Sequence, residues 1–126
     1  MEKKKGYAIM GLTFVEGTIH GPTGKKSTAQ FLVDSGATYT LLSRDHWKAI
    51  GLIPKREMNF TLADGTVVKR SISECIISLV QGEAYTPVIL GEEGDESLLG
   101  IVTLEILGLM LNPFHRTLEP MKMMLA

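Results

Sequence analysis

A short stretch in the first third of the chain combines groups that could carry out acid–base chemistry. The apolar run Phe-Leu-Val at 31–33 is followed directly by Asp34, Ser35 and Gly36, which supply a carboxylate, a hydroxyl group and a glycine. The apolar run favours a β-strand, so Asp34 is expected where a strand gives way to a turn, and a carboxylate there is costly to bury without partners. The same tripeptide is also ordinary turn chemistry. Asp34 is therefore a candidate catalytic acid, and an Asx-turn is the alternative.

Length and charge narrow the possible functions. A chain of 126 residues is long enough for one domain with a real core, so we expect a single domain over 1–126. Thirteen basic and fourteen acidic residues leave a net charge of −1, which gives no electrostatic footprint for nucleic acid. No stretch approaches the roughly 20 apolar residues that span a bilayer, and the N-terminal apolar run is too short for a secretory signal. We expect a soluble, cytoplasmic protein with no nucleic-acid or membrane partner.

Cysteine and histidine give no sign of a metal or cofactor. The single Cys75 excludes an internal disulfide framework and a Cys-rich zinc site, and its two isoleucine neighbours predict a buried or half-buried thiol. His20, His46 and His115 lie far apart in the sequence and lack metal-ligand spacing. We therefore expect no metal and no cofactor.

Short β-rich segments separated by glycine-rich turns make up most of the chain. Short helices are expected at 44–50, capped by Ser43 and ended by Gly51, and at 102–107, ended by Gly108. Strands are expected at 7–19, 27–33, 38–42, 58–62, 66–70, 73–80, 84–90 and 109–112, and the tail 113–126 is a candidate for one more. This pattern predicts an all-β fold, a mainly antiparallel sandwich or small barrel.

Two further motifs follow the Asp-Ser-Gly sequence along the chain. Ala-Asp-Gly at 63–65 separates two β-rich runs, and Asp-Gly in such a place is among the strongest hairpin signals. Leu-Leu-Gly at 98–100 comes just before the second expected helix. Between them, the loop 91–96 carries four acidic residues. We expect a solvated loop there, with a role in substrate specificity or calcium affinity as the alternative.

In this order, the three motifs resemble those of the retropepsin-like aspartic proteases, the single-domain relatives of pepsin. Leu-Val-Asp-Ser-Gly-Ala at 32–37 is similar to the family signature, in which two apolar residues precede Asp-Thr/Ser-Gly-Ala. The hairpin at 63–65 lies where the family carries its substrate-covering flap, and 98–100 resembles the family's hydrophobic-hydrophobic-Gly motif. The resemblance spans about 12–112. It implies an all-β, retropepsin-like acid protease fold, a closed antiparallel barrel-like domain with one or two short helices.

One departure from the viral pattern concerns an ion pair. Retroviral members often pair an acid two residues after the signature glycine with an arginine directly after the second motif's glycine. Those positions are Thr38 and Ile101 here, so both partners are absent together. The chain therefore looks like a member of a cellular or prokaryotic branch.

The resemblance implies an aspartic endopeptidase, which hydrolyses peptide bonds with two carboxylates that share one proton. Of the four aspartates, only Asp34 lies in the signature. Asp45 falls in the first turn of the first expected helix, Asp64 in the hairpin turn, and Asp95 in the acidic loop. The second catalytic Asp34 is therefore expected from the other subunit of a homodimer.

The expected site residues follow from the same resemblance. Asp34 is the catalytic acid, Ser35 steadies the loop across the dimer axis, and Gly36 lets the backbone approach the substrate. The residues expected to bind a peptide or protein substrate are Ala37, Thr38, Ala63, Asp64, Gly65, Thr66 and Leu99. The alternative from another functional class is a non-catalytic dimerisation or peptide-binding module that retains the fold, because a fold does not prove an activity.

Overall fold

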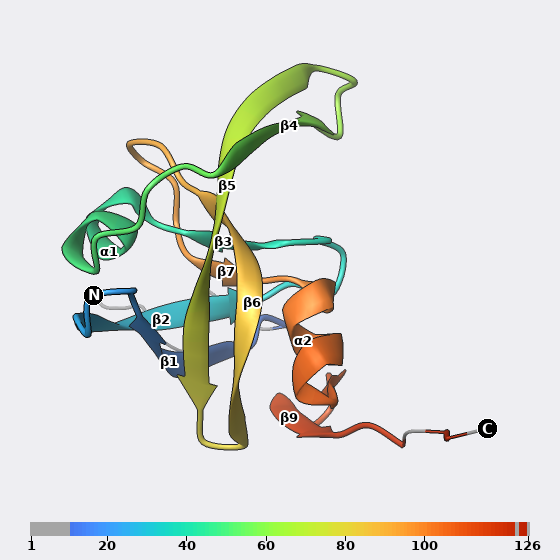
Figure 1. Cartoon of the computed structure of the whole chain (residues 1–126). Helices are drawn as coiled ribbons and strands as arrows, with labels where there is room; N and C mark the ends of the chain where they lie inside the picture. Colours follow the sequence, from blue (N-terminus) through green and yellow to red (C-terminus); the bar gives the residue numbers. More distant parts are fainter. Residues whose placement is uncertain (1–10, 123, 126) are drawn as a thin grey trace, which may run out of the picture.

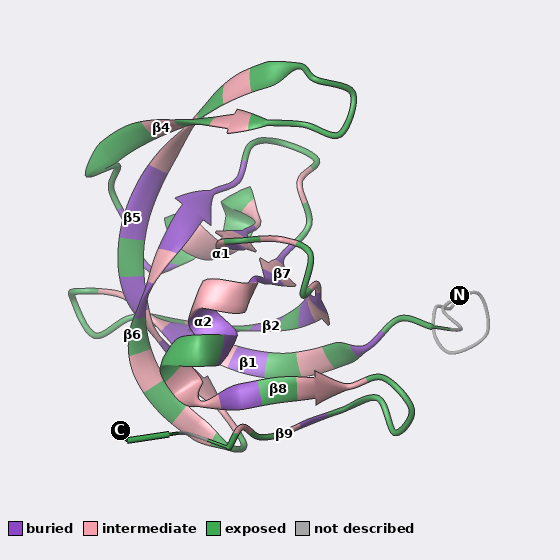
Figure 2. Ribbon diagram, turned by 90° about the vertical axis from the view of Figure 1, so that its right-hand side faces the viewer, coloured by how far each residue is buried: buried purple, intermediate pink, exposed green. Residues whose placement is uncertain are grey.

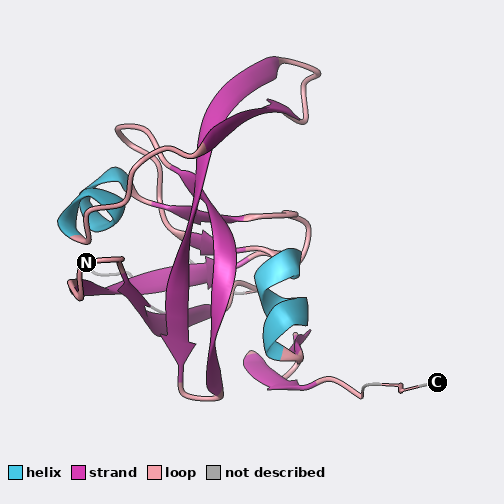
Figure 3. Cartoon of the chain, viewed as in Figure 1, coloured by secondary structure: helices cyan, strands magenta, loops and turns pink. Residues whose placement is uncertain are grey.

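β-Strands dominate the computed structural model, which describes residues 11–122, 124 and 125 (Figure 1). The strands of this part of the chain are β1 (Phe14–His20), β2 (Lys26–Val33), β3 (Thr40–Leu42), β4 (Arg56–Thr61), β5 (Val67–Leu79), β6 (Gly82–Leu90), β7 (Leu98–Leu99), β8 (Leu109–Asn112) and β9 (Thr117–Pro120). Two short helices, α1 (Arg44–Ala49) and α2 (Ile101–Leu107), lie on opposite sides of the strands (Figure 3). The predicted all-β class is confirmed. Residues 7–10 of the first expected strand lie outside the described residues.

Seven strands form one sheet that closes on itself. Their order is β1-β2-β7-β3-β6-β5-β4, and β1 also pairs with β5, so that six strands form a ring and β4 extends beyond it. Most pairings are antiparallel, as expected, but β2 with β7 and β3 with β6 are parallel. The two-residue β7 inserts between β2 and β3, parallel to β2 and antiparallel to β3. The loop that joins β2 to β3 must therefore cross the end of β7.

The hairpins follow the turn signals in the sequence. β1 and β2 pair antiparallel across the glycine-rich turn at 21–25, and β4 and β5 pair across 62–66, where Gly65 adopts a left-handed conformation (φ 88°). The two strands expected at 66–70 and 73–80 are instead the single strand β5. The reason is that Ile72 pairs with Arg56 of β4 and with Ile89 of β6, so one ladder continues into the next without a break.

The interior of the ring is filled by aliphatic and aromatic side chains. Its fully buried members include Ile19, Phe31, Leu42, Ile50, Ile77, Val88, Leu99 and Leu104. Cys75 belongs to this core, which confirms the expected burial, and burial raises the pKa of its thiol to about 12. Along the long strands, buried positions are interspersed with exposed ones, as Figure 2 shows.

Helix α1 packs against the core through its C-terminal end. Ile50 is buried and Trp47 is half-buried, and the Trp47 indole N–H donates a hydrogen bond of 2.8 Å to the carbonyl oxygen of Gly91. Gly51 is left-handed (φ 75°), as its expected role at the helix end requires. Ser43 occupies the N-cap position, but its side chain makes no capping hydrogen bond.

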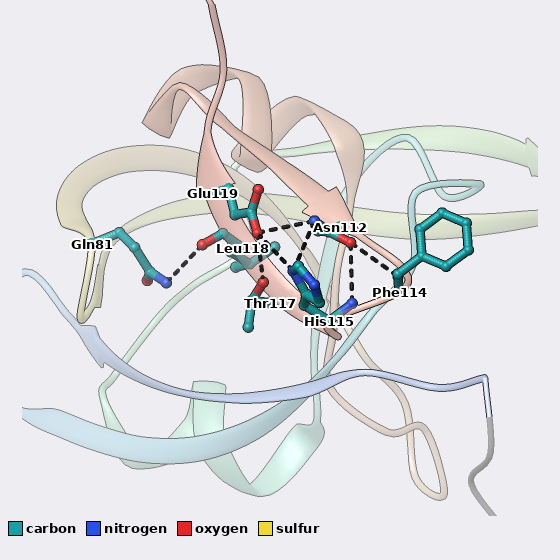
Figure 4. Close-up of polar contacts among 7 residues, drawn as sticks. All are labelled: Gln81, Asn112, Phe114, His115, Thr117, Leu118 and Glu119. Carbon is teal, nitrogen blue, oxygen red and sulfur yellow. Dashed lines mark hydrogen bonds and ion pairs between the residues drawn. The ribbon is translucent and has the colours of Figure 1, made fainter.

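The end of the chain forms a separate two-stranded sheet, β8 with β9, which confirms the strand expected in the tail. This small sheet is attached to the rest of the fold by Leu109 and Leu118, whose side chains are part of the core. Asn112 organises its turn: the side-chain oxygen accepts the backbone N–H groups of Phe114 and His115, and the amide nitrogen donates to Glu119 at 3.1 Å (Figure 4). No helix in the described part of the chain has the length and apolar character needed to cross a membrane.

Candidate active site

The loop 34–39 begins where β2 ends and is anchored through its backbone. The N–H of Val33 donates to the carbonyl oxygen of Thr13 at 2.8 Å, and the N–H of Asp34 donates to that of Leu99 at 2.9 Å. These bonds place Asp34 at the rim of the ring, where its side chain is half-buried. The apolar strand β2 thus ends directly before Asp34, and its end places the carboxylate at the surface.

The Asp34 side chain is oriented by its own loop. The backbone N–H of Gly36 donates to Asp34 Oδ1 at 3.0 Å, and the N–H of Ala37 donates to the carbonyl oxygen of Asp34 at 3.1 Å. The Asx-type turn weighed from the sequence is therefore present. It fixes the direction of the carboxylate, so the turn and a chemical role for Asp34 are compatible.

The motif at 98–100 supports this loop from below. A Cβ on Gly100 would lie 2.6 Å from the carbonyl oxygen of Tyr39 and 2.8 Å from that of Thr38, closer than real Cβ contacts. The first N–H groups of α2 also face the loop: Ile101 donates to the carbonyl oxygen of Ala37 at 2.8 Å, and Val102 to that of Thr38 at 3.0 Å. The first and third motifs of the sequence are thus in direct contact.

A chain of buried hydroxyl groups continues the support, and the sequence reasoning missed it. Gly100 N–H donates to Thr40 Oγ1 at 3.1 Å, Thr40 and Thr103 are hydrogen-bonded at 2.5 Å, and Thr103 and Thr86 at 2.7 Å. Each of the three threonines is at most 1% exposed. They come from β3, α2 and β6, so the only signal in the sequence was a threonine beside apolar residues in each of three separate segments.

A cleft of about 370 Å³ lies between the loop and the β4–β5 hairpin. Gly36, Ala37, Thr38 and Tyr39 line it from the loop. The hairpin contributes Phe60, Thr61, Leu62, Val68 and Arg70, and the ring contributes Leu41, Ile89 and Leu98, with Asp95 from the acidic loop. In Figure 1 the hairpin projects from the ring on the same side as the loop. The loop that follows Asp34 and the part of the hairpin nearest the ring therefore face each other across the cleft.

The residues expected to bind substrate occupy three kinds of position. Ala37 and Thr38 line the cleft. Ala63, Asp64, Gly65 and Thr66 form the exposed end of the hairpin and are not among the residues that line it. Leu99 is fully buried in the core and meets the loop only through its carbonyl oxygen, whereas its neighbour Leu98 lines the cleft. The outward side chain of the motif is thus Leu98.

Two charged residues, Arg70 and Asp95, are among those that line the cleft. Arg70 has a 25% exposed side chain and lies 3.7 Å from the Glu92 carboxylate. Asp95 accepts the backbone N–H of Glu92 at 2.8 Å, which closes the acidic loop on itself. Among the residues that the structure describes, no group of three or more His, Cys, Asp or Glu side chains is placed to hold a metal ion.

The sequence comparisons agree with this geometry. The model of the family described as "gag-polyprotein putative aspartyl protease" matches residues 15–105, which include Asp34, the β4–β5 hairpin and the 98–100 motif. None of the curated proteins matches the chain. Because the family model covers more than half of the sequence, the chain belongs to this retropepsin-like aspartyl protease family.

Proposed function

We propose that the protein is an aspartic endopeptidase whose active site is completed by a second copy of the chain. The single observation that carries this proposal is the placement of Asp34. Its carboxylate is held by the Gly36 N–H at the rim of the ring, two residues from an apolar cleft and within a family of aspartyl proteases.

The chemistry requires two carboxylates in close contact. Like charges at short range cannot both ionise easily, so the pair shares one proton. The ionised member takes a proton from a bound water, which attacks the carbonyl carbon of the peptide bond. The protonated member hydrogen-bonds the carbonyl oxygen as charge develops there. The pair titrates as a unit, and the two roles belong to the dyad rather than to either residue.

The surface around Asp34 supports a homodimer. Ser35 and Gly36, the next two residues, are exposed. Leu12 and Phe14 are each 41% exposed, and they flank Thr13, whose carbonyl oxygen binds the residue before Asp34. Apolar side chains beside a surface carboxylate are expected where a second copy covers both. In that dimer, Ser35 steadies the paired loops across the two-fold axis.

The β4–β5 hairpin is proposed to close over the substrate as a flap. It projects beyond the ring, and its inner residues already form one wall of the cleft. Closure would bring 63–66 against an extended peptide, exclude water, and add backbone hydrogen bonds of the strand type. The substrate is thus proposed to be an extended segment of a protein.

The proposal is tested by cleavage of an unfolded protein at mildly acidic pH. We expect Asp34→Asn to lower the cleavage rate about 10²- to 10⁴-fold, because the amide can neither accept nor donate the proton that moves in the reaction. Asp45→Asn is the matched control, since Asp45 lies exposed on α1. We expect it to keep the rate of the unmodified chain.

Two outcomes would contradict the proposal. Equal slow cleavage by the unmodified protein and by Asp34→Asn would show that the activity comes from elsewhere. Binding of unfolded protein without any cleavage would instead assign the chain to the non-catalytic peptide-binding class.

A further inference from the structure

The long strand β5 has a gap in the pairing along one of its edges. Its ladder with β4 ends at Ile72, and its ladder with β1 covers only Ile76 to Ser78. Within the described part of the chain, no strand therefore pairs with residues 73–75 on that edge. The opposite edge is paired with β6 throughout this region. A short interior stretch of β5 thus has the free backbone that is typical of an edge strand.

The backbone polar groups of Glu74 face this gap. The carbonyl oxygen of Ile72 points to the same edge, because the N–H of Lys55 donates to it at 2.9 Å. Backbone groups alternate between the two edges of an antiparallel strand, so those of Glu74, two residues further along, point there as well. The N–H and C=O of Glu74 are thus a donor and an acceptor that no ladder of the described residues uses.

Two prolines explain why the flanking segments leave Glu74 unpaired. Continuing the register of β1 would place Pro22 opposite Glu74, and continuing the register of β4 would place Pro54 there. Proline has no N–H to donate, so neither segment can complete the pair. The two segments also pack against each other, because a Cβ on Gly21 would collide with the carbonyl group of Ile50. The segments that border the gap are therefore held in place by the fold.

A cavity of about 470 Å³ opens at the gap, and this volume lies within the usual range of ligand sites. Its apolar wall consists of Leu52, Ile53, Ile76 and Tyr85. Ile53 and Tyr85 are large side chains that are 66% and 71% exposed, so much of this wall is free for contact. The cavity shares no lining residue with the cleft beside Asp34.

The polar groups of the cavity select an uncharged ligand. Its lysine and its glutamate, Lys55 and Glu74, are paired with each other at 3.2 Å. The hydroxyl group of Ser73 also borders the cavity; this residue is 3% exposed, and its oxygen has no hydrogen-bond partner among the described residues. The unused hydrogen-bonding groups are thus neutral ones, a hydroxyl group and one backbone N–H and C=O.

We propose that this cavity binds one residue of an extended peptide segment of a partner protein. The N–H of that residue donates to the carbonyl oxygen of Glu74, and its own carbonyl oxygen accepts the N–H of Glu74, as in an antiparallel ladder. Its side chain is apolar and packs against Ile53 and Tyr85. The site lies apart from the cleft and needs no carboxylate dyad, so it goes beyond the proposed function.

The test is an NMR titration of the isotope-labelled protein with N-acetyl-leucine-N′-methylamide. This probe has the N–H, the C=O and the apolar side chain of one such residue. We expect a Kd on the order of 1 mM, as for other ligands of this size, and a downfield shift of the Glu74 amide proton as it gains an acceptor. The same probe with a methyl group on the leucine nitrogen cannot donate to Glu74, and we expect it to bind about 2- to 10-fold more weakly.

Three variants show whether the probe uses this cavity. Tyr85→Ala removes part of the apolar wall from an exposed position, and we expect about 3- to 10-fold weaker binding. Val80→Ala is the matched control, because Val80 is 99% exposed and does not line the cavity. It should bind the probe as the unmodified chain does, and so should Asp34→Asn. The amide spectrum of each variant shows whether it is folded.

Several results would overturn the inference. They are a Glu74 amide proton that does not move as the probe is added, equal binding of the N-methylated probe, and shifts confined to residues of the cleft. Strong protection of the Glu74 amide from hydrogen exchange without any probe would also overturn it, since the chain or a second copy would then fill the position. Absence of cleavage by the unmodified protein would overturn the proposed function and leave this inference intact.

Discussion

Gly100 shows how one residue without a side chain shapes the candidate site. The backbone of Tyr39 and Thr38 passes over it at a distance that leaves no room for a Cβ. We expect Gly100→Ala to destabilise the fold by about 1–3 kcal/mol, since an added methyl in a packed position forces backbone shifts. The displaced backbone is the loop that carries Asp34. The cleavage rate should therefore fall by more than the loss of folded protein alone would cause. Chemical denaturation and peptide cleavage measure the two effects.

Gly82 provides the matched control for that substitution. A Cβ there would meet only Leu107, at 3.9 Å, which is ordinary contact. We expect Gly82→Ala to leave stability within about 1 kcal/mol and the cleavage rate unchanged. If Gly100→Ala proves as stable and active as Gly82→Ala, the close approach does not position the loop.

Among single residues, Asp34 could be predicted from the sequence, but the residues that hold its loop in place could not. The motif around Asp34 is contiguous, so it is visible as a string. Thr40, Thr86 and Thr103 meet only after three separate elements fold together, and Tyr39 and Phe60, whose rings pack edge to face, lie 21 positions apart on two different elements. Contacts of this kind leave no local pattern. The sequence also does not say which of two adjacent leucines faces outward. It therefore placed Leu99 at the substrate, whereas Leu98 is the leucine that lines the cleft.

At the scale of elements, the tip of the β4–β5 hairpin depends on an ionised carboxylate. The hydroxyl and the backbone N–H of Thr66 hydrogen-bond Asp64 and hold its pKa below the usual 3.8. A lowered pKa in the folded state means that the bond stabilises the turn above pH 4 or so, and that this support is lost as the pH falls through the lowered value. We therefore expect the hairpin turn to stay intact at mildly acidic pH.

A carboxyl titration by NMR checks this expectation. The midpoint of Asp64 should lie below 3.8 in the unmodified chain. In Thr66→Ala, which removes the hydroxyl and keeps the backbone N–H, the midpoint should rise toward that value. A midpoint at or above 3.8 in the unmodified chain would contradict the hydrogen-bonded turn.

The elements themselves were predictable to different degrees. The β4–β5 hairpin follows from Asp-Gly between two β-rich runs, which is a local signal. β7 has two residues and pairs with strands far away in the sequence, so no period reveals it. The closure of the ring joins Thr18 to Ser78. The strand pattern allowed either a sandwich or a small barrel, and only the resemblance to a family favoured the closed form.

For the whole molecule, the proposal requires activity to depend on association. The exposed Leu12 and Phe14 beside Asp34 form part of the face that a second copy would cover. We expect cleavage per chain to rise with protein concentration and to follow the dimer fraction seen by sedimentation. When unmodified chains are mixed with an equal amount of Asp34→Asn and allowed to exchange, about a quarter of the dimers keep two carboxylates, and only these should cleave.

The mixture also gives the contradicting outcome. At the same total concentration of chains, activity that falls to a half and not to a quarter of that of the unmodified protein would mean that each chain works alone. The same conclusion would follow if the protein sedimented as a monomer at a concentration where cleavage is already at its maximum.

The uninterrupted course of β5 has a mechanical consequence. From Ile72 to Leu79 the strand is bonded to β6, and near its end also to β1, whereas from Val67 to Ser71 it is bonded only to β4. The hairpin is thus a two-stranded projection that is held by the rest of the sheet from Ile72 onward, with no break in β5 that would act as a hinge. Such a projection bends along its whole free length, and its stiffness falls steeply as that length grows. If the hairpin closes over the substrate as proposed, the range of movement of its tip is set by the number of residue pairs beyond Ile72, and adding or deleting one pair is expected to change that range more than any single side chain there.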